Sequence, residues 1–447
     1  MALQPYARNV ALQSKQHVRY LASAAAAIKR SNEPPAPFVA RETLKTSKVG
    51  NTTVASIETN QAISRLAIYF RAGSRFETDQ TQGVVHMLRI CAGLGTGGAS
   101  HFGLTRNVEL AGANLSCTAG REFIGYTIDA ARDKISSVDK FLQDVAMNQV
   151  FKPWEVSDNV PRARLERSIR PPEARLMEQI HKAAFRKGLG YSLYSPKWML
   201  GNHKSEMLSK FVKENFLEAA VVGVGMPHEQ AVDFASRLNL SGGQKASTLA
   251  KYNPGADLRK ETNDRLAYVA LAVQGPSLSD PKKATAAALV HRALGTPSRV
   301  CHGLAPNSKL TTALGDNDVK AAAVGFSASY SDSGLVGVYI AAPAKRVDAI
   351  TRKSADILRS AKFSAQDATR AKGILKGDLA LEDETGQGLV EYLAVQSLLG
   401  KPLPLSEQLA LVDSVTAEDM NAVLSGGKLS MAVFGNVSNV PYLDELK

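Results

Sequence analysis

The chain has 447 residues, of which 44% are apolar and 21% are charged. This length is too great for one ordinary core and predicts two to four domains of about 150 residues each. The composition is typical of a soluble globular protein, and no run of about 18 apolar residues predicts a membrane-spanning helix. The net charge is +12, but the cations are scattered without a nucleic-acid-binding signature. We therefore expect no nucleic acid partner, and a solvated surface that in part faces acidic lipid or acidic proteins.

The first 32 residues are typical of a mitochondrial targeting segment. They hold five cations and no acid, and the first acidic residue is Glu33. Apolar residues alternate with the cations, and no compact apolar region of the kind found in a secretory signal follows. Arg19-Tyr20-Leu21 resembles a matrix cleavage site after Tyr20. We therefore predict a presequence over residues 1–20, which leaves a net charge of +9, and an extended Pro-rich lead-in over residues 21–37.

Alternating and β-branched patterns predict strands in the following region, and apolar residues at helical spacing predict helices. A polar, Gly-rich stretch over residues 241–258 predicts a linker. The expected strands cover residues 52–58, 65–71, 113–118, 122–130 and 219–225. The expected helices cover residues 83–94, 134–149, 154–187 and 205–215, with another beginning at Pro227.

The second half of the sequence repeats the first. Arg65-Leu66-Ala67 returns 200 positions later as Arg265-Leu266-Ala267, and Leu94-Gly95-Thr96 returns at the same offset as Leu294-Gly295-Thr296. In each half, the Arg-Leu-Ala and Leu-Gly-Thr tripeptides enclose an expected strand, a Gly/Ser turn and an expected helix. A closing strand over residues 429–434 matches residues 219–225. We therefore predict two similar α+β domains, over residues 38–240 and 259–447.

One segment of the first expected domain has the spacing of a zinc-peptidase motif. His86-Met87-Leu88-Arg89-Ile90 lies where His-x-x-Glu-His would place two zinc ligands and a general base on one helix face. Arg89 is a fixed cation that cannot accept a proton, and Ile90 has no lone pair. A later helix supplies an acid, Glu166, in a basic setting. Since one imidazole cannot hold zinc, we expect no metal and no catalytic residue here.

Other candidate sites are weaker. Gly93-Leu-Gly95-Thr-Gly97-Gly98 matches the dinucleotide fingerprint, but that fingerprint requires a preceding strand and here a helix is expected. No cofactor is therefore predicted. Without family context, His86 on an apolar helix is best interpreted as a core or interface histidine. The three cysteines, Cys91, Cys117 and Cys301, are widely spaced and odd in number, which argues against a disulfide framework.

Several motifs together resemble the pitrilysin/insulinase-type peptidases and their mitochondrial relatives, from about residue 38 to the end. This resemblance implies a clam-shell arrangement of two similar domains, each a mixed, mostly antiparallel sheet packed with helices. The motifs that carry it are Ala72-Gly73-Ser74-Arg75-Phe76-Glu77, Gly83-x-x-His86, Arg106-x-x-Glu109-x-x-Gly112-Ala113, Arg121-Glu122-x-x-x-Tyr126 and Met177–Phe185.

The resemblance leaves three mitochondrial branches to separate. The catalytic subunit of the processing peptidase keeps His-x-x-Glu-His, which this chain lacks. Its non-catalytic partner carries a dense glycine-rich loop, whereas residues 294–303 here contain only two glycines. The core proteins of the cytochrome bc1 complex (complex III) form the third branch. Trp154-Glu155-Val156, Ser192–Pro196 and residues 379–400 resemble that branch.

The core-protein branch implies a structural role. Such a subunit would pair with core protein 1 on the matrix side of the mitochondrial inner membrane. It would help to hold cytochrome b, cytochrome c1, the iron–sulfur subunit and small subunits in a dimeric complex. His86, Arg89 and Ile90 would then be the remnant of a lost metal site in a protein kept for assembly. The alternative is a presequence-binding, non-catalytic subunit of the processing peptidase.

Overall fold

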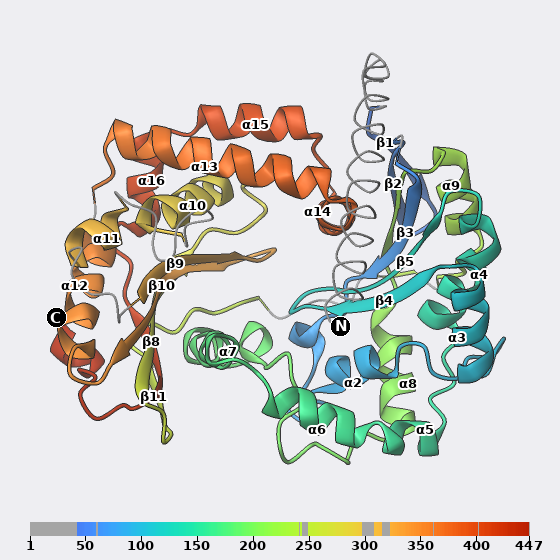
Figure 1. The fold of residues 1–447 in the computed structure, drawn as a ribbon, viewed down its shortest axis with the longest axis horizontal. Coiled ribbons are helices and arrows are strands. Elements are labelled where there is room, and N and C mark those ends of the chain that lie inside the picture. The colour runs from blue at the N-terminus through green and yellow to red at the C-terminus, as the bar shows by residue number, and fades with distance from the viewer. Residues whose placement is uncertain are drawn as a thin grey trace, which may run out of the picture. The chain divides into compact units, whose positions relative to one another are not determined.

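The computed structural model describes residues 43–59, 61–240, 242–243, 249–296, 308–314, 322–360, 362–400 and 402–446. The expected presequence over residues 1–20 and the lead-in over residues 21–37 lie outside these ranges. Two sheets organise the described chain (Figure 1).

The first sheet has six strands in the order β1-β2-β6-β3-β5-β4. Only the pair β2 and β6 is parallel among its described pairings. Four of the strands match the expected ranges closely, and β3 begins two residues early. The expectation missed β1, because its Lys- and Ser-containing sequence KTSKV has no apolar alternation. The strands are β1 Lys45–Val49, β2 Thr52–Ile57, β3 Ile63–Phe70, β4 Asn114–Ala119, β5 Ile124–Ala131 and β6 Ala219–Val224.

The second sheet has five strands in the order β7-β11-β8-β10-β9. Its parallel pair, β7 and β11, stands in the place of β2 and β6, and β8, β10 and β9 stand in the places of β3, β5 and β4. This correspondence confirms the predicted repeat of two mixed, mostly antiparallel sheets. The strands are β7 Asp257–Glu261, β8 Leu266–Gly275, β9 Ala322–Ser329, β10 Gly334–Pro343 and β11 Ser430–Gly435.

The helices of the first half include two departures from the sequence prediction. The single helical stretch expected over residues 154–187 is wrong, because it forms α5, α6 and α7. Pro171 and Pro172 end its continuity, since a proline lacks the N–H of the helical ladder and disfavours helix at the residue before it. The polar helix α3 was not expected. The helices are α2 Val84–Cys91, α3 His101–Leu110, α4 Ile135–Met147, α5 Pro153–Asp158, α6 Val160–Ser168, α7 Pro172–Phe185, α8 Ser205–Asn215 and α9 His228–Ser236.

The second half has helices in the same general order. Short 3-10 turns lie at Ser74–Phe76 and Gly188–Gly190 in the first half and at Leu443–Leu446 in the second. The helices are α10 Pro281–Leu294, α11 Lys309–Leu314, α12 Val347–Ser360, α13 Ala365–Glu384, α14 Gly386–Leu398, α15 Leu405–Ser414 and α16 Ala417–Leu424.

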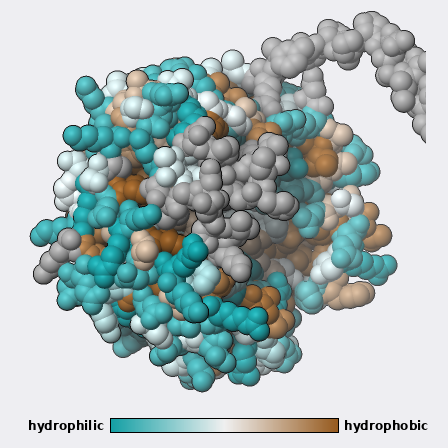
Figure 2. Space-filling view, turned by 60° about the vertical axis from the view of Figure 1, so that its left-hand side comes forward, coloured by the Kyte–Doolittle hydropathy of each residue, from teal (hydrophilic) through white to brown (hydrophobic). Residues whose placement is uncertain are grey.

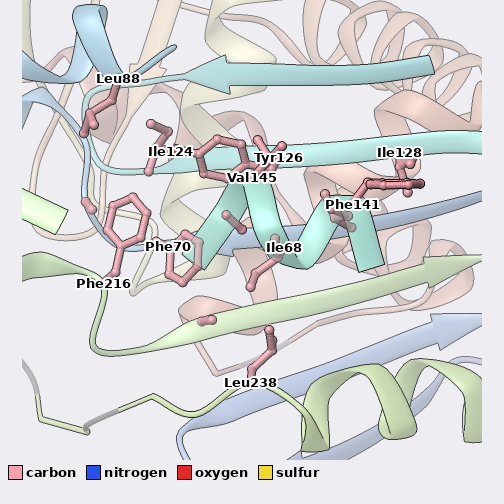
Figure 3. Close-up of a cluster of buried hydrophobic side chains, with 14 of the residues drawn as sticks. Ile68, Phe70, Leu88, Ile124, Tyr126, Ile128, Phe141, Val145, Phe216 and Leu238 are labelled. Carbon is pink, nitrogen blue, oxygen red and sulfur yellow. The ribbon is translucent and has the colours of Figure 1, made fainter. Parts of the chain in front are cut away.

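One face of each sheet packs against helices of its own half. In the first sheet, the rings of Phe70 and Phe216 stack with centroids 4.1 Å apart, and Tyr126 lies edge-on to both (Figure 3). Phe141 and Val145 of α4 complete this part of the cluster. Burial of such side chains contributes about 1.5–3 kcal/mol each, so this face forms a substantial core.

The other face of each sheet is covered by a helix from the opposite half. Helix α14 packs its Leu389 and Leu393 against the first sheet, in a cluster with Val222. Helix α7 packs Leu176 against the second sheet, in a cluster with Phe434. Each half therefore completes the core of the other, which ties residues before and after the linker into one folded body.

Hydrophilic residues cover much of the visible face in Figure 2, with hydrophobic residues scattered among them. Among the described residues, no helix is both long and apolar enough to cross a membrane. Several large hydrophobic side chains are nevertheless exposed, and Trp154 and Trp198 are more than half exposed at 62% and 63%.

Candidate functional site

Helix α2 carries the degenerate motif, and its start is held in place from two sides. Gly83 has a left-handed φ of 85°, and a Cβ there would lie 2.5 Å from the Cα of Ser195. Both features require glycine. The Glu77 carboxylate accepts hydrogen bonds from the N–H groups of Gly83 (2.8 Å) and Val85 (2.9 Å). Burial raises the pKa of Glu77 to about 8, although these two donors oppose the shift. The motif is therefore presented by a rigid helix start.

His86 is buried and hydrogen-bonded at both ring nitrogens. Its side chain is 1% exposed. Nδ1 accepts from the backbone N–H of Ser195 (3.2 Å) and Nε2 lies 3.1 Å from Oε2 of Glu166. Because the Ser195 N–H can only donate, the proton of the neutral imidazole belongs on Nε2. The Ser195 hydroxyl donates to the carbonyl of Gly83 (3.0 Å). His86 is thus a fully partnered donor to a carboxylate.

Arg89 stands where a zinc peptidase has its general base, and it binds the same carboxylate. Its guanidinium donates to Oε2 of Glu166, and Arg162 donates to Oε1 (3.3 Å). Burial alone would raise the pKa of Glu166, but the Arg89 charge and hydrogen bond lower it. The pKa of His86 is lowered to about 4, mainly by burial; the Glu166 carboxylate opposes this shift and the Arg89 charge adds to it. The site is therefore a neutral histidine beside an arginine–carboxylate pair.

The donor set does not fit a metal ion. Ile90 is buried in the first core and has no donor atom. His86 and Glu166 supply one imidazole and one carboxylate, whereas catalytic zinc takes three protein ligands. Within the described ranges, no group of three His, Cys, Asp or Glu side chains has the geometry of a metal site. Arg89 brings its own positive charge to Glu166, and no catalytic step through a metal follows from this arrangement.

The sequence singled out Glu166 as an acid on a later helix, and the structure places its carboxylate 3.1 Å from His86. The sequence did not single out Ser195. A serine whose backbone N–H fixes an imidazole leaves no signal in a single sequence, and only the neighbouring Ser192–Pro196 pattern drew attention to that loop.

The other motifs considered from the sequence do not form sites. The loop from Gly93 to Gly98 follows α2 rather than a strand, so the dinucleotide reading is excluded there, and the Gly95 N–H donates to Glu155 (3.0 Å). Cys91 is buried in the first core, and burial raises the pKa of its thiol to about 12. Cys301 and residues 297–303 of the expected loop region lie outside the described residues.

A mostly buried set of charged side chains, Arg75, Glu122 and Asp332, joins the two halves of the chain. The Arg75 guanidinium donates to Glu122 (2.6 Å) and also to Asp332 of the β9–β10 turn (2.8 Å). Glu122 in turn accepts from the N–H (2.8 Å) and hydroxyl (2.5 Å) of Ser331. The side chains of Arg75 and Glu122 are 1% and 3% exposed. Arg75 and Glu122 each come from a motif that carried the family resemblance, and both therefore form contacts between the two halves.

Helix α7 contributes a second part of this joint. His181 donates from Nδ1 to the carbonyl of Met177 (2.7 Å), so its Nε2 accepts from the Tyr330 hydroxyl (2.7 Å). Arg121 pairs with Glu178 at 2.6 Å. The sequence marked this helix through its Ile-His-Lys-Ala-Ala-Phe segment but gave no indication that its histidine contacts the second half.

Two family models match the chain. The model described as insulinase (peptidase family M16) matches residues 53–197, which include β2 to β5 and the degenerate motif. The model described as peptidase M16 inactive domain matches residues 205–375.

Similarity to individual proteins extends over almost the whole chain. The chain is 31% identical to human cytochrome b-c1 complex subunit 2, mitochondrial, over 92% of this chain and 93% of the relative. A probable mitochondrial-processing peptidase subunit alpha-2 of Arabidopsis thaliana is 27% identical over 92% of this chain and 86% of the relative. A mitochondrial-processing peptidase subunit beta of Neurospora crassa is 28% identical over 84% of this chain and 83% of the relative.

Proposed function

The chain belongs to the insulinase family of peptidases (peptidase family M16), and within this family we propose that it is a non-catalytic core subunit of the mitochondrial cytochrome b-c1 complex. The similarity to mammalian subunit 2 sequences, at 30–31% identity over more than nine-tenths of the chain, supports this assignment. The similarity to processing-peptidase alpha subunits is lower, at 26–27%.

The geometry at His86 is the observation that carries the non-catalytic part of the proposal. A hydrolase of this family needs a carboxylate base and an open metal position. Here Arg89 occupies the base position, and its guanidinium is bound to the Glu166 carboxylate. A small cavity of about 380 Å³ reaches Arg89 and Glu166, and His86 does not line it. We therefore assign the chain no catalytic residue and no metal.

In this role the subunit contributes shape and buried surface rather than chemistry. It would be peripheral to the inner membrane on the matrix side and would pair with core protein 1. Cytochrome b, cytochrome c1, the iron–sulfur subunit and small subunits would complete a dimeric assembly. Obligate interfaces of this kind bury about 2,000–5,000 Å². The similarity to a subunit of that complex is what supports these partners.

Depletion of the protein tests the proposal. We expect complex III to disappear from native gels and ubiquinol–cytochrome c reductase activity to fall, and re-expression of the wild-type chain should restore both. Arg89→Met with Glu166→Gln, which removes the ion pair, should restore them equally well because the site performs no chemistry. Normal complex III with failed presequence cleavage would instead establish the alternative, a presequence-binding subunit of the processing peptidase.

Metal analysis tests the absence of zinc separately. Purified protein that is dialysed against a weak chelator should retain far less than one zinc ion per chain, because a single imidazole does not hold zinc. Stoichiometric zinc that is lost in His86→Ala would contradict the pseudoenzyme assignment.

A further inference from the structure

A cavity of about 680 Å³ lies along the exposed face of α7, outside the degenerate motif. Arg175, Gln179 and Lys182 of that helix line it at helical spacing, while the opposite face of α7 packs against the second sheet. Lys260 of β7 and Phe434 of β11 form part of its wall. The second sheet therefore holds the floor of the cavity in position.

The cavity has a strong excess of positive charge. Its two acids already have partners: Asp79 binds Lys187 and the Tyr191 hydroxyl, both at 2.8 Å, and Glu178 binds Arg121 at 2.6 Å. In the part of the chain that the structure describes, six lining cations have no acidic partner. These cations are Arg167, Arg170, Arg175, Lys182, Arg186 and Lys260.

Two of the guanidinium groups are fixed in place rather than free in solvent. Arg170 donates from Nε to the Arg167 carbonyl (2.9 Å), and its guanidinium carbon lies 4.6 Å from the ring centre of Tyr194. Arg175 donates to the Ser168 carbonyl (2.7 Å). Burial lowers the pKa of Arg170, the Glu178 carboxylate opposes this shift, and the like charges of Arg167 and Arg175 add to it. Cations are thus held together against their mutual repulsion, which an anion would relieve.

We propose that this cavity binds a small ligand that carries two or more phosphate groups. Fixed guanidinium forks match phosphate oxygens in a bidentate manner. The volume lies within the range of about 300–1,000 Å³ that is typical of small-molecule pockets. The rings of Tyr194 and Trp198 offer apolar contact beside the charges. A basic presequence would be repelled, so the site differs from a peptide-guiding surface. This inference does not depend on membership of the cytochrome complex.

Tryptophan fluorescence of the full chain measures this binding directly. The sequence has two tryptophans, so Trp154→Phe leaves Trp198 in the cavity wall as the sole reporter. Inorganic tripolyphosphate is the soluble probe, and vesicles of phosphatidylcholine with or without cardiolipin, a lipid with two phosphates, are the lipid probe. We expect saturable binding of tripolyphosphate at one site per chain, weakened by added salt.

The variant Lys182→Gln with Lys260→Gln removes two exposed cations of the cavity with little risk to folding. It should weaken binding by about tenfold or more, because charge-assisted hydrogen bonds are lost. Lys210→Gln with Lys213→Gln on α8 removes the same charge elsewhere and should leave the affinity unchanged. Arg170→Gln should also weaken binding. Binding of cardiolipin vesicles alone, with the same response to the variants, would identify a lipid headgroup as the source of the phosphates.

Three results would overturn the proposal. The first is an absence of saturable binding to either probe. The second is an equal loss of affinity in the α8 control variant, which would show that only net charge attracts the anion. The third is tighter binding of a polyglutamate peptide than of tripolyphosphate, which would show an acidic protein segment to be the occupant.

Discussion

Helices α2 and α10 occupy equivalent positions in the two halves, yet they bury different chemistry. Each follows a central strand of its sheet; α2 ends shortly before Leu94-Gly95-Thr96, and α10 ends at the first residue of Leu294-Gly295-Thr296. At the repeat offset of 200 residues, Ala286 corresponds to His86 and Leu289 corresponds to Arg89. Ala286 and Leu289 are 1% and 0% exposed in the second core. At these two positions the first half keeps a histidine and an arginine, and the second half has apolar side chains. The polar groups of α10 lie at other positions, at His291 and in the pair of Arg292 with Asp378 at 3.1 Å.

This difference shows that the fold does not need polar groups at this position. Where they are kept, each must be partnered, because a buried group that loses its partner costs more than the pair contributes. His86 uses both ring nitrogens, and Glu166 receives three donors. We therefore regard the first site as a closed hydrogen-bonded set and the second as ordinary core.

The largest expected effect concerns the buried charges that join the halves. Glu122→Ala removes the acceptor of Arg75 and Ser331, and we expect a loss of about 3–5 kcal/mol in the free energy of unfolding. Urea denaturation measures it. Glu261→Ala, which removes an exposed carboxylate at the end of β7, should change stability by less than about 0.5 kcal/mol. Equal losses in both variants would show that the joint contributes nothing specific.

A pair of substitutions at corresponding positions tests the comparison directly. Leu289→Ala leaves a cavity in the second core and should cost about 3 kcal/mol. Arg89→Ala removes a side chain that is 27% exposed and should cost about 1 kcal/mol or less. Urea denaturation of both variants provides the numbers. If Arg89→Ala were the more damaging change, the first site would be a principal source of stability.

Acid should weaken the fold in part through the buried imidazole of His86. The pKa of folded His86 is about 4, below the value near 6.5 expected in the unfolded chain. Between these values the unfolded chain binds more protons, so stability falls as pH drops from about 6.5 to 4, with a contribution of about 2–3 kcal/mol from His86. His86→Asn should reduce this pH dependence, measured as melting temperature against pH. His101→Asn, at an exposed histidine, should leave the dependence as it is, and an unchanged profile in His86→Asn would contradict the assignment.

The smallest expected effect is the coupling between Arg89 and Glu166. Both side chains are partly exposed, at 27% and 21%, so solvent weakens their attraction. A double-mutant cycle with Arg89→Met and Glu166→Gln should give a coupling of about 0.5–1 kcal/mol. Gln is chosen at position 166 because its amide oxygen would still accept a hydrogen bond from His86. A coupling of several kcal/mol would show that the pair is a major stabilising element.

The repeat and most strands could be predicted because apolar alternation and matching tripeptides are local signals. Helix α3 was missed because its sequence HFGLTRNVEL has only a narrow apolar face, with Leu104 and Val108 buried. The break before α7 was missed although Pro171 and Pro172 signalled it. The exchange of α7 and α14 could not have been predicted, since an amphipathic pattern identifies the buried face of a helix but not the sheet that covers it.

The candidate site was predictable in part. His86 and Glu166 could be predicted as parts of one degenerate metal motif, because the spacing of a zinc motif and an acid on a later helix are visible in the sequence. The joint through Arg75 and Glu122 was visible only as family motifs, without a role, because the partner Asp332 lies far along the chain. The basic cavity draws its residues from α6, α7, β7 and β11, and no local pattern unites them.

The exchanged helices delay the completion of the first core while the chain is synthesised. The strands of the first sheet are complete at Val224, but one apolar face of that sheet stays uncovered until Gly386–Leu398 has emerged. Contacts so distant in sequence form slowly, and uncovered apolar strands are prone to aggregate in the interval. A fragment that ends in the linker would therefore need a chaperone, and the two halves reach their native cores together rather than in turn.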